Sequence, residues 1–374
     1  MAMEIELKLT LAKDHLEMLK QHPLLTGASS TAYPANALQN IYFDTPDHKL
    51  SEHRVALRIR HKQGRFIQTF KTQGHSEAGL HARNEWEWEV PSAELDLSLI
   101  DDEAWPSTLD RDYVTQTIAP VFSTDFVRQV WWYEGVGEQG EPVAIEVALD
   151  TGAAWAEIGG ERVSDDICEV ELELKQGEAS SLFQVAMALA QRVPLLTADT
   201  SKAERGYRLH RQGFRLPART PIAVTQEMSC EAVYCELLQQ EVALWPRYLE
   251  AWKVTGEWHY ADLALASIRN IGALFHAFDE TFPQDAEGDI DRLLTKLIRQ
   301  MRDLTAFERV DTLMVGSTGQ WSKQSHQRSA ERLSVLLQTV EPGLLVLKLA
   351  DLLVNKRWRA RWTEAQKARA ALPL

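Results

Sequence analysis

The sequence predicts an α+β protein in which a strand-rich first part precedes an all-helical second part. Charged residues occupy every second position in residues 4–8, 58–60, 85–89 and 169–173, and residues two apart share one face of a strand. Further along the chain this alternation is lost, and apolar residues recur at helical spacing instead. Between the two parts, residues 211–223 are rich in glycine, proline and arginine, which predicts a linker.

In the first part, turn signals separate the expected strands. Thr45-Pro46-Asp47 ends one strand, Gln63-Gly64 predicts a hairpin, and Pro91 stops another strand. Residues 91–120 are expected to be helical or irregular, and residues 202–210 close the region. The expected strands are residues 4–9, 39–44, 56–61, 66–72, 84–90, 121–133, 143–150 and 167–174, and the expected helices are residues 12–21 and 178–192.

The second part has the periodicity of a helical bundle. We therefore expect one domain at residues 1–210, a linker at residues 211–223 and a helical domain at residues 224–374. Charge follows the same division, because residues 211–374 hold 21 basic and 20 acidic side chains while residues 1–210 hold 19 and 34. The expected helices are residues 229–243, 245–252, 260–278, 290–311, 329–339 and 344–371.

The composition argues against several classes of protein. A formal net charge of -14 argues against general nucleic-acid binding, which needs a basic face. Three cysteines are too few for a disulfide framework, and the start of the chain lacks the basic and apolar regions of a signal peptide. No run of about 18 apolar residues predicts a membrane span. A cytoplasmic protein without membrane contacts is therefore expected, and the sequence does not give its oligomeric state.

The alternating strands predict a sheet that is closed on itself. Such strands normally expose their charges to water, but three of these charged faces carry one sign only, and their apolar partners are large, as at Trp86, Trp88 and Leu172. Amphipathic helices are available to cover the apolar side. The closed sheet would then enclose its charges.

Enclosed charges of this kind would need counterions. Carboxylates about 4 Å apart repel by roughly 4 kcal/mol at an effective dielectric constant near 20, and oxygen-rich clusters suit Mg²⁺ or Mn²⁺. The basic side chains of Arg58, Arg60 and Lys71 would need an anion, and Arg binds phosphate oxygens well. A triphosphate with bound metal would satisfy both halves. The acidic side chains of this cluster are Glu4, Glu6, Glu169, Glu171 and Glu173.

These residues resemble the CYTH superfamily of triphosphate tunnel metalloenzymes. Glu4-Ile5-Glu6-Leu7-Lys8 resembles its ExExK signature, and five further motifs follow in order over about 205 residues. The resemblance implies an eight-stranded antiparallel β-tunnel that binds triphosphates with divalent metal. The further motifs are Tyr42-Phe43-Asp44-Thr45, Leu57-Arg58-Ile59-Arg60, Thr69-Phe70-Lys71, the Glu169–Glu173 strand and Ser201-Lys202-Ala203-Glu204-Arg205-Gly206-Tyr207.

Within that family, the chain is most similar to bacterial inorganic triphosphatases that carry a CHAD-type helical domain. The tracts at residues 122–128 and 168–174 suggest this, and Ile268-Arg269 and Arg302-Asp303-Leu304 resemble CHAD more loosely. Residues 224–374 depart from the usual CHAD composition, because their histidines are few and their charge is nearly neutral. They could bind polyphosphate, gate the tunnel mouth or stabilise the first domain.

The resemblance implies Mg²⁺-dependent (or Mn²⁺-dependent) hydrolysis of tripolyphosphate to diphosphate and phosphate. Alternatives within the fold are thiamine triphosphatase and class IV adenylate cyclase activity, and a non-catalytic polyphosphate-binding module is a further one. Lys8, Glu6 and Arg58 are the implied catalytic residues. The implied metal ligands are Glu4, Glu6, Asp150, Glu169, Glu171 and Glu173, and the implied substrate ligands are Lys8, Arg58, Arg60, Lys71, Arg128, Lys202 and Arg205.

Some charged residues keep two interpretations. Glu85, Glu87 and Glu89 share a face, and they either contact metal or pair with the basic strands. Glu146 shares a face with Asp150. Arg83 either reaches the substrate or lies at the surface.

Overall fold

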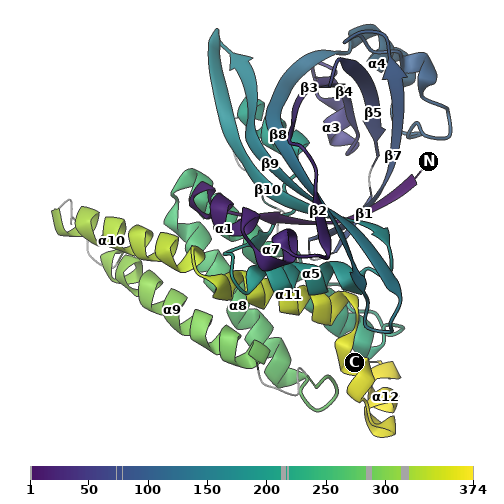
Figure 1. Ribbon diagram of the computed structural model, residues 1–374. Coiled ribbons are helices and arrows are strands. Elements are labelled where there is room, and N and C mark those ends of the chain that lie inside the picture. The colour runs from purple at the N-terminus through teal and green to yellow at the C-terminus, as the bar shows by residue number, and fades with distance from the viewer. Residues whose placement is uncertain are drawn as a thin grey trace.

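The computed structural model confirms the α+β prediction (Figure 1). It describes residues 2–72, 74–77, 79–211, 216, 219–283, 289–312 and 320–373. Of the predicted linker at residues 211–223, residues 212–215 and 217–218 lie outside the described residues. The domain boundaries therefore stay predictions.

Eight of the described strands close into an antiparallel ring that forms the tunnel. The ring closes where β7 pairs with the first half of β1, in a register that runs from Ala2 opposite Glu85 to Leu7 opposite Leu80. In ring order the strands are β1 (Ala2–Thr10), β10 (Glu161–Gln176), β9 (Pro142–Ile158), β8 (Ala119–Val136), β3 (Asn36–Asp44), β4 (Ala56–Lys62), β5 (Arg65–Lys71) and β7 (Leu80–Val90).

Three short strands and several helices flank the ring. Strand β2 (Ser30–Ala32) pairs with β8, β6 (His75–Glu77) pairs with β7, and β11 (Leu196–Thr197) pairs with the second half of β1. The flanking helices are η1 (Lys13–His15), α1 (Leu16–Lys20), α2 (Pro23–Thr26), α3 (Lys49–Glu52), η2 (Leu97–Leu99), α4 (Arg111–Thr117), α5 (Ser180–Ala190) and α6 (Lys202–Arg211).

The strands turn their charged faces inward and their apolar faces outward. On β1, Leu7 and Leu9 are fully buried on the outer side, in one core with Leu172 of β10 and Phe183 of α5. Burying a side chain of this kind contributes about 1.5–3 kcal/mol. The helices that cover the outer face therefore supply the apolar energy that holds the charged face inside.

The helical part differs from prediction at three points. The helix expected at residues 329–339 begins earlier, as α10 (Gln320–Leu337). The two helices expected at residues 229–243 and 245–252 are one helix, α7 (Cys230–Thr255), which contains Pro246. The single helix expected at residues 344–371 is wrong, because the chain breaks at Lys356, whose φ is 47°. The other elements are α8 (Trp258–Ala277), α9 (Asp289–Thr312), α11 (Val340–Val354), η3 (Arg357–Arg361) and α12 (Glu364–Ala371).

A continuous hydrophobic core joins the tunnel to the helices. It includes Ile145 of β9, Phe183 of α5, Trp245 of α7 and Leu347 of α11. Figure 1 shows α5 and α11 where the strands meet the helical part. Among the described residues, no single helix is long and apolar enough to cross a membrane, although one bent pair, Gln327–Leu337 with Val340–Val354, meets that test jointly.

Candidate functional site

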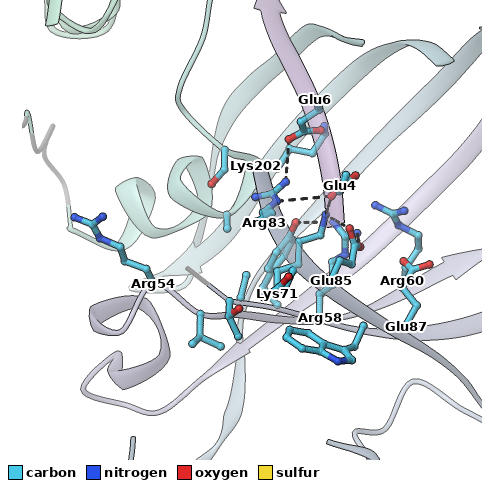
Figure 2. Close-up of a pocket in the computed structure, with 18 of the residues that line it drawn as sticks. Glu4, Glu6, Arg54, Arg58, Arg60, Lys71, Arg83, Glu85, Glu87 and Lys202 are labelled. Atoms are coloured by element: carbon cyan, nitrogen blue, oxygen red, sulfur yellow. Dashed lines mark hydrogen bonds and ion pairs between the residues drawn. The ribbon is translucent and has the colours of Figure 1, made fainter. Parts of the chain in front are cut away.

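A cavity of about 1610 Å³ occupies the tunnel, and all eight strands of the ring contribute to its wall. Figure 2 shows acidic and basic side chains converging in it from different strands. Its acidic residues include Glu4, Glu6, Glu85, Glu87, Glu146, Glu171 and Glu173, and its basic residues include Lys8, Arg54, Arg58, Arg60, Lys71, Arg83, Arg128 and Lys202.

Strand register sets the order of the charges along the wall. Glu6 of β1 is opposite Glu173 of β10, and Glu173 is in turn opposite Glu146 of β9. Lys8 is opposite Glu171 in the next inward-facing row. Three carboxylates thus lie side by side across three adjacent strands.

Strand β4 lies four strands from β10 in either direction around the ring. Arg58 and Arg60 therefore extend from the wall opposite the one that carries Glu171 and Glu173. The tunnel has an acidic wall and a basic wall, as the alternating charges predict.

Lys202 of α6 closes the largest ion cluster. Its Nζ lies 2.6 Å from Asp150, 2.5 Å from Glu169 and 2.9 Å from Glu171. Arg128 donates to both oxygens of Asp150, at 2.7 and 2.6 Å, and to Glu171 at 2.5 Å. Lys8 lies 3.2 Å from Glu171.

These contacts favour the ionised forms of Glu171 and Lys202 despite their burial. Burial alone would raise the pKa of Glu171, but Lys202, Lys8 and Arg128 hold this pKa well below its usual value. Burial would likewise lower the pKa of Lys202, and Asp150, Glu169 and Glu171 raise it instead. Oxygens of these three carboxylates lie within 4.8 Å of one another, close enough to share a cation.

A second ion network lies where β1, β5 and β7 meet (Figure 2). Lys71 lies 2.6 Å from Glu85 and 3.1 Å from Glu4. Arg83 lies 3.0 Å from Glu6 and 3.8 Å from Glu4. The carboxylates of the ExExK-like strand therefore already contact cations of the neighbouring strands.

Arg60 has no carboxylate partner among the described residues. Its Nε donates to Asn40 at 2.9 Å. Burial, together with the positive charges of Arg58 and Arg128, lowers the pKa of Arg60 to about 10. An anion bound at this point would relieve the repulsion.

Glu173, in contrast to Arg60, is repelled by nearby negative charges. Burial raises its pKa, the ion pair with Lys175 acts against this rise, and the charges of Glu4 and Glu146 add to it. A cation would relieve that repulsion, so these oxygen donors fit a hard divalent ion.

Ten of the thirteen predicted site residues line the cavity. The other three are Asp150, Glu169 and Arg205. Asp150 and Glu169 are completely buried and bond to Lys202, and Arg205 Nε lies 3.8 Å from Glu169 Oε2. The lining residues are Glu4, Glu6, Lys8, Arg58, Arg60, Lys71, Arg128, Glu171, Glu173 and Lys202.

The carboxylates of β7, for which the sequence left two interpretations, have different surroundings. Glu85 pairs with Lys71 and lies 3.6 Å from Arg58, and Glu87 accepts a hydrogen bond from Thr69 at 3.2 Å. Glu89 lies outside the cavity, 3.9 Å from Arg65.

Two cavity residues have roles that the sequence analysis missed. Tyr42 accepts a hydrogen bond from Arg58 at 3.4 Å, and its motif position was a usable signal. Arg54 lines the cavity from a turn with a φ of 56°. It lies outside any alternating strand, so the pattern gave no signal for it.

Asp44, within a family-like motif, has a structural role. It is almost fully buried, and it accepts hydrogen bonds from the backbone of Thr45, Leu50 and Ser51 and from the Tyr207 hydroxyl. It thereby ties helix α3 to helix α6 at the cavity wall.

Comparison with known families agrees with this geometry. The profile of the CYTH domain matches residues 2–207, which is more than half of the chain. The chain belongs to the CYTH domain family. The resemblance expected from the motifs is thus confirmed, and the likeness of residues 224–374 to CHAD stays a prediction.

A protein with a described activity is similar in sequence to this chain. An inorganic triphosphatase of Haemophilus influenzae is 34% identical over 219 residues, which cover 57% of each protein. The chain thus spans little more than half the length of this relative.

Solved structures are also similar to this chain. One is a candidate adenylyl cyclase of Hippeastrum, reported with a dominant triphosphatase activity, at 20% identity and a TM-score of 0.36, covering 57% of this chain and 98% of that one. Another is a candidate adenylate cyclase of Bacillus halodurans, at 22% identity and a TM-score of 0.29, covering 53% of this chain and 93% of that one. At such TM-scores the likeness does not bear on function.

Proposed function

We propose that the protein hydrolyses inorganic triphosphate to diphosphate and phosphate with a divalent metal ion, inside the tunnel. The observation that carries the proposal is that an acidic wall and a basic wall face each other across the cavity. Arg60 lacks a carboxylate partner among the described residues, and across the lumen Glu173, which pairs with Lys175, is also repelled by Glu4 and Glu146. A triphosphate with its metal ion supplies the missing charge at both walls.

The metal ligands we propose are carboxylates of the acidic wall. A bound Mg²⁺ or Mn²⁺ ion would offset charge on the phosphate oxygens and acidify a water molecule. Asp150 and Glu169, which do not line the cavity, would support this wall by holding Lys202. The ligands in contact with the ion would be Glu4, Glu6, Glu171 and Glu173, with Glu146 beside them.

The basic side chains would bind the phosphate chain. Arg58 and Arg60 can each present two N–H groups to phosphate oxygens. Arg128, whose Nε and Nη2 bond to Asp150, would contribute its Nη1, and Lys71 and Lys8 add point charges. As the bond between phosphorus and the bridging oxygen breaks, negative charge grows on the leaving diphosphate, and fixed cations stabilise it. The water oxygen joins the terminal phosphorus. In this proposal Lys8, Glu6 and Arg58 are the catalytic residues, and Lys202 and Arg205 belong to the substrate-binding set.

The relative from Haemophilus influenzae supports an inorganic substrate, because its name describes an inorganic triphosphatase. Polyphosphate binding by residues 224–374 stays a prediction from the resemblance. Two basic side chains there already have acidic partners, since Arg292 pairs with Asp289 and Lys296 with Glu341.

The test is phosphate release from tripolyphosphate, ATP and thiamine triphosphate, assayed side by side with Mg²⁺ and with EDTA. We expect tripolyphosphate to be the best substrate and EDTA to abolish release. The Glu6→Ala variant should be inactive. Comparable rates on all three substrates would remove the inorganic preference, and a Glu6→Ala variant as active as wild type would refute the proposed metal wall.

A further inference from the structure

Helix α6 has one side in the tunnel and another against the helical part. On the tunnel side, Lys202 bonds to Asp150, Glu169 and Glu171, and the Tyr207 hydroxyl donates to Asp44. Lys202 and Tyr207 both line the cavity. The position of α6 therefore decides where the Lys202 charge lies.

On the opposite side, two residues of α7 hold α6 and Thr200, which lies two residues before it. Arg247 donates to Glu204 at 2.5 Å and also to the hydroxyl of Thr200. That hydroxyl donates in turn to Glu250 at 2.5 Å. Thr200 is completely buried, so these bonds are formed away from water.

Glu250 also faces the arginines of α6. It accepts a hydrogen bond from Arg208 at 3.2 Å and lies 3.9 Å from Arg205. Arg247 lies 3.6 Å from it on the same helix. Burial would raise the pKa of Glu250, but Arg205 and Arg247 lower it, so the carboxylate is ionised at neutral pH.

Arg205 connects Glu250 to the ion cluster around Lys202. It is nearly buried, and its Nε lies 3.8 Å from Glu169, a carboxylate that bonds to Lys202. A neutral side chain at position 250 would leave the guanidiniums of Arg205, Arg208 and Arg247 close together without this counterion. Asp165, which lies 3.7 Å from Arg205 and also pairs with Arg208, and Glu204, which pairs with Arg247, would remain. Losing Glu250 would therefore weaken the hold of α7 on α6 and let the arginines move apart.

We propose that Glu250 is a positioning residue for the tunnel, and that through α6 it holds Lys202 against the carboxylates of the acidic wall. The proposal rests on the proposed function for its effect on activity. It gives residues 224–374 a definite task, because α7 belongs to that part of the chain.

The test compares Glu250→Gln, which removes the charge and keeps the shape, with Glu236→Gln on the exposed side of the same helix. We expect Glu250→Gln to lower kcat/KM for tripolyphosphate about 10-fold, a typical size for coupling between sites. The amide hydrogens of α6 should exchange faster in this variant. The Glu236→Gln control should match wild type in both measurements.

A double-mutant cycle with Lys202→Met separates positioning from a general loss of stability. If Glu250 acts through Lys202, adding Glu250→Gln to Lys202→Met should cost less than about twofold more, whereas independent effects multiply. Glu250→Asp keeps the charge and should retain most of the activity. If Glu250→Gln does not fold, Thr200→Val, which removes one hydrogen bond to Glu250, takes its place and should lower kcat/KM and speed exchange in α6 to a smaller extent.

The two proposals fail in different ways. If wild type releases no phosphate from tripolyphosphate, the proposed function is wrong, and amide exchange of α6 alone decides whether Glu250 holds the helix. If wild type is active and Glu250→Gln has normal kcat/KM and normal exchange in α6, the positioning role is refuted. Multiplicative effects in the cycle would also refute it.

Discussion

Glu6 and Glu173 are directly opposite each other in the antiparallel pair of β1 and β10. Residues in such positions have Cβ atoms about 4.5–5.5 Å apart, and like charges there destabilise the sheet. Glu146 on β9 extends the same row. Arg83, through Glu6, and Lys175, through Glu173, offset part of this repulsion, and a bound metal ion would offset more. This relationship therefore links the stability of the tunnel to its proposed metal ion.

Glu173→Gln should therefore stabilise the metal-free protein and impair its activity. Removing one charge of the row should raise the unfolding free energy in EDTA by about 0.2–1 kcal/mol. It should also raise the Mg²⁺ concentration needed for phosphate release and reduce the stabilisation by Mg²⁺.

Thermal unfolding with EDTA and with Mg²⁺ checks this prediction for Glu173. Glu157→Gln, at an exposed position of β9, is the matched control and should change neither quantity. A Glu173→Gln variant with wild-type Mg²⁺ dependence would contradict a role for Glu173 in holding metal.

Arg60→Gln should reduce activity without reducing stability. The wild-type guanidinium is near Arg58 and Arg128 with no carboxylate partner in the described structure, so its removal relieves repulsion in the free protein. Losing a group that stabilises developing charge typically costs about 100- to 1000-fold in kcat.

Steady-state kinetics and thermal unfolding together check the effect at Arg60. The control is Arg65→Gln on β5, where the side chain is 60% exposed and 3.9 Å from Glu89. If Arg60→Gln destabilises the protein and leaves kcat/KM unchanged, Arg60 is structural and the anion site is elsewhere.

Asp44→Ala should destabilise the protein strongly, because it removes an acceptor that serves three backbone amides and the Tyr207 hydroxyl. Each hydrogen bond to a charged group contributes about 1.5–3 kcal/mol, and some of these bonds will be replaced by bonds to water. We expect a loss of about 3 kcal/mol.

Urea unfolding measures the effect of Asp44→Ala. Asp47→Ala, at a neighbouring and more exposed carboxylate, should lose much less stability than Asp44→Ala. Equal losses in the two variants would show that Asp44 does not join α3 to α6 in the way described.

The Glu250 network should make stability depend on pH at acidic values. The pKa of Glu250 is lowered in the folded protein, so the unfolded state binds protons first. Its contribution is present above the unfolded Glu pKa of about 4.3 and is lost as pH falls through the lower folded value.

The difference in unfolding free energy between wild type and Glu250→Gln should thus be constant near pH 7 and should shrink below about pH 4.3. Urea unfolding at a series of pH values measures it. A difference that grows on acidification would mean that the folded pKa of Glu250 is raised.

Much of the tunnel could be predicted from local sequence patterns. Alternation with period two places Glu4, Glu6 and Lys8 on one face of a strand wherever that strand lies, because side chains alternate along any extended backbone. Pure charge on one face and large apolar residues on the other then indicate which face is enclosed. The motifs identified the family, and the family match agrees with them.

Local patterns could not say which charges meet. That Arg58 and Arg60 oppose β10, and that Asp150 and Glu169 contact Lys202 without lining the cavity, depend on the number of strands and on how the ring closes. The Glu250 contacts with α6 likewise depend on packing between helices that are separated along the chain. Residues fix only their own face of a strand or helix, whereas register and closure follow from many distant pairings acting together, so the tertiary structure alone decided the partners.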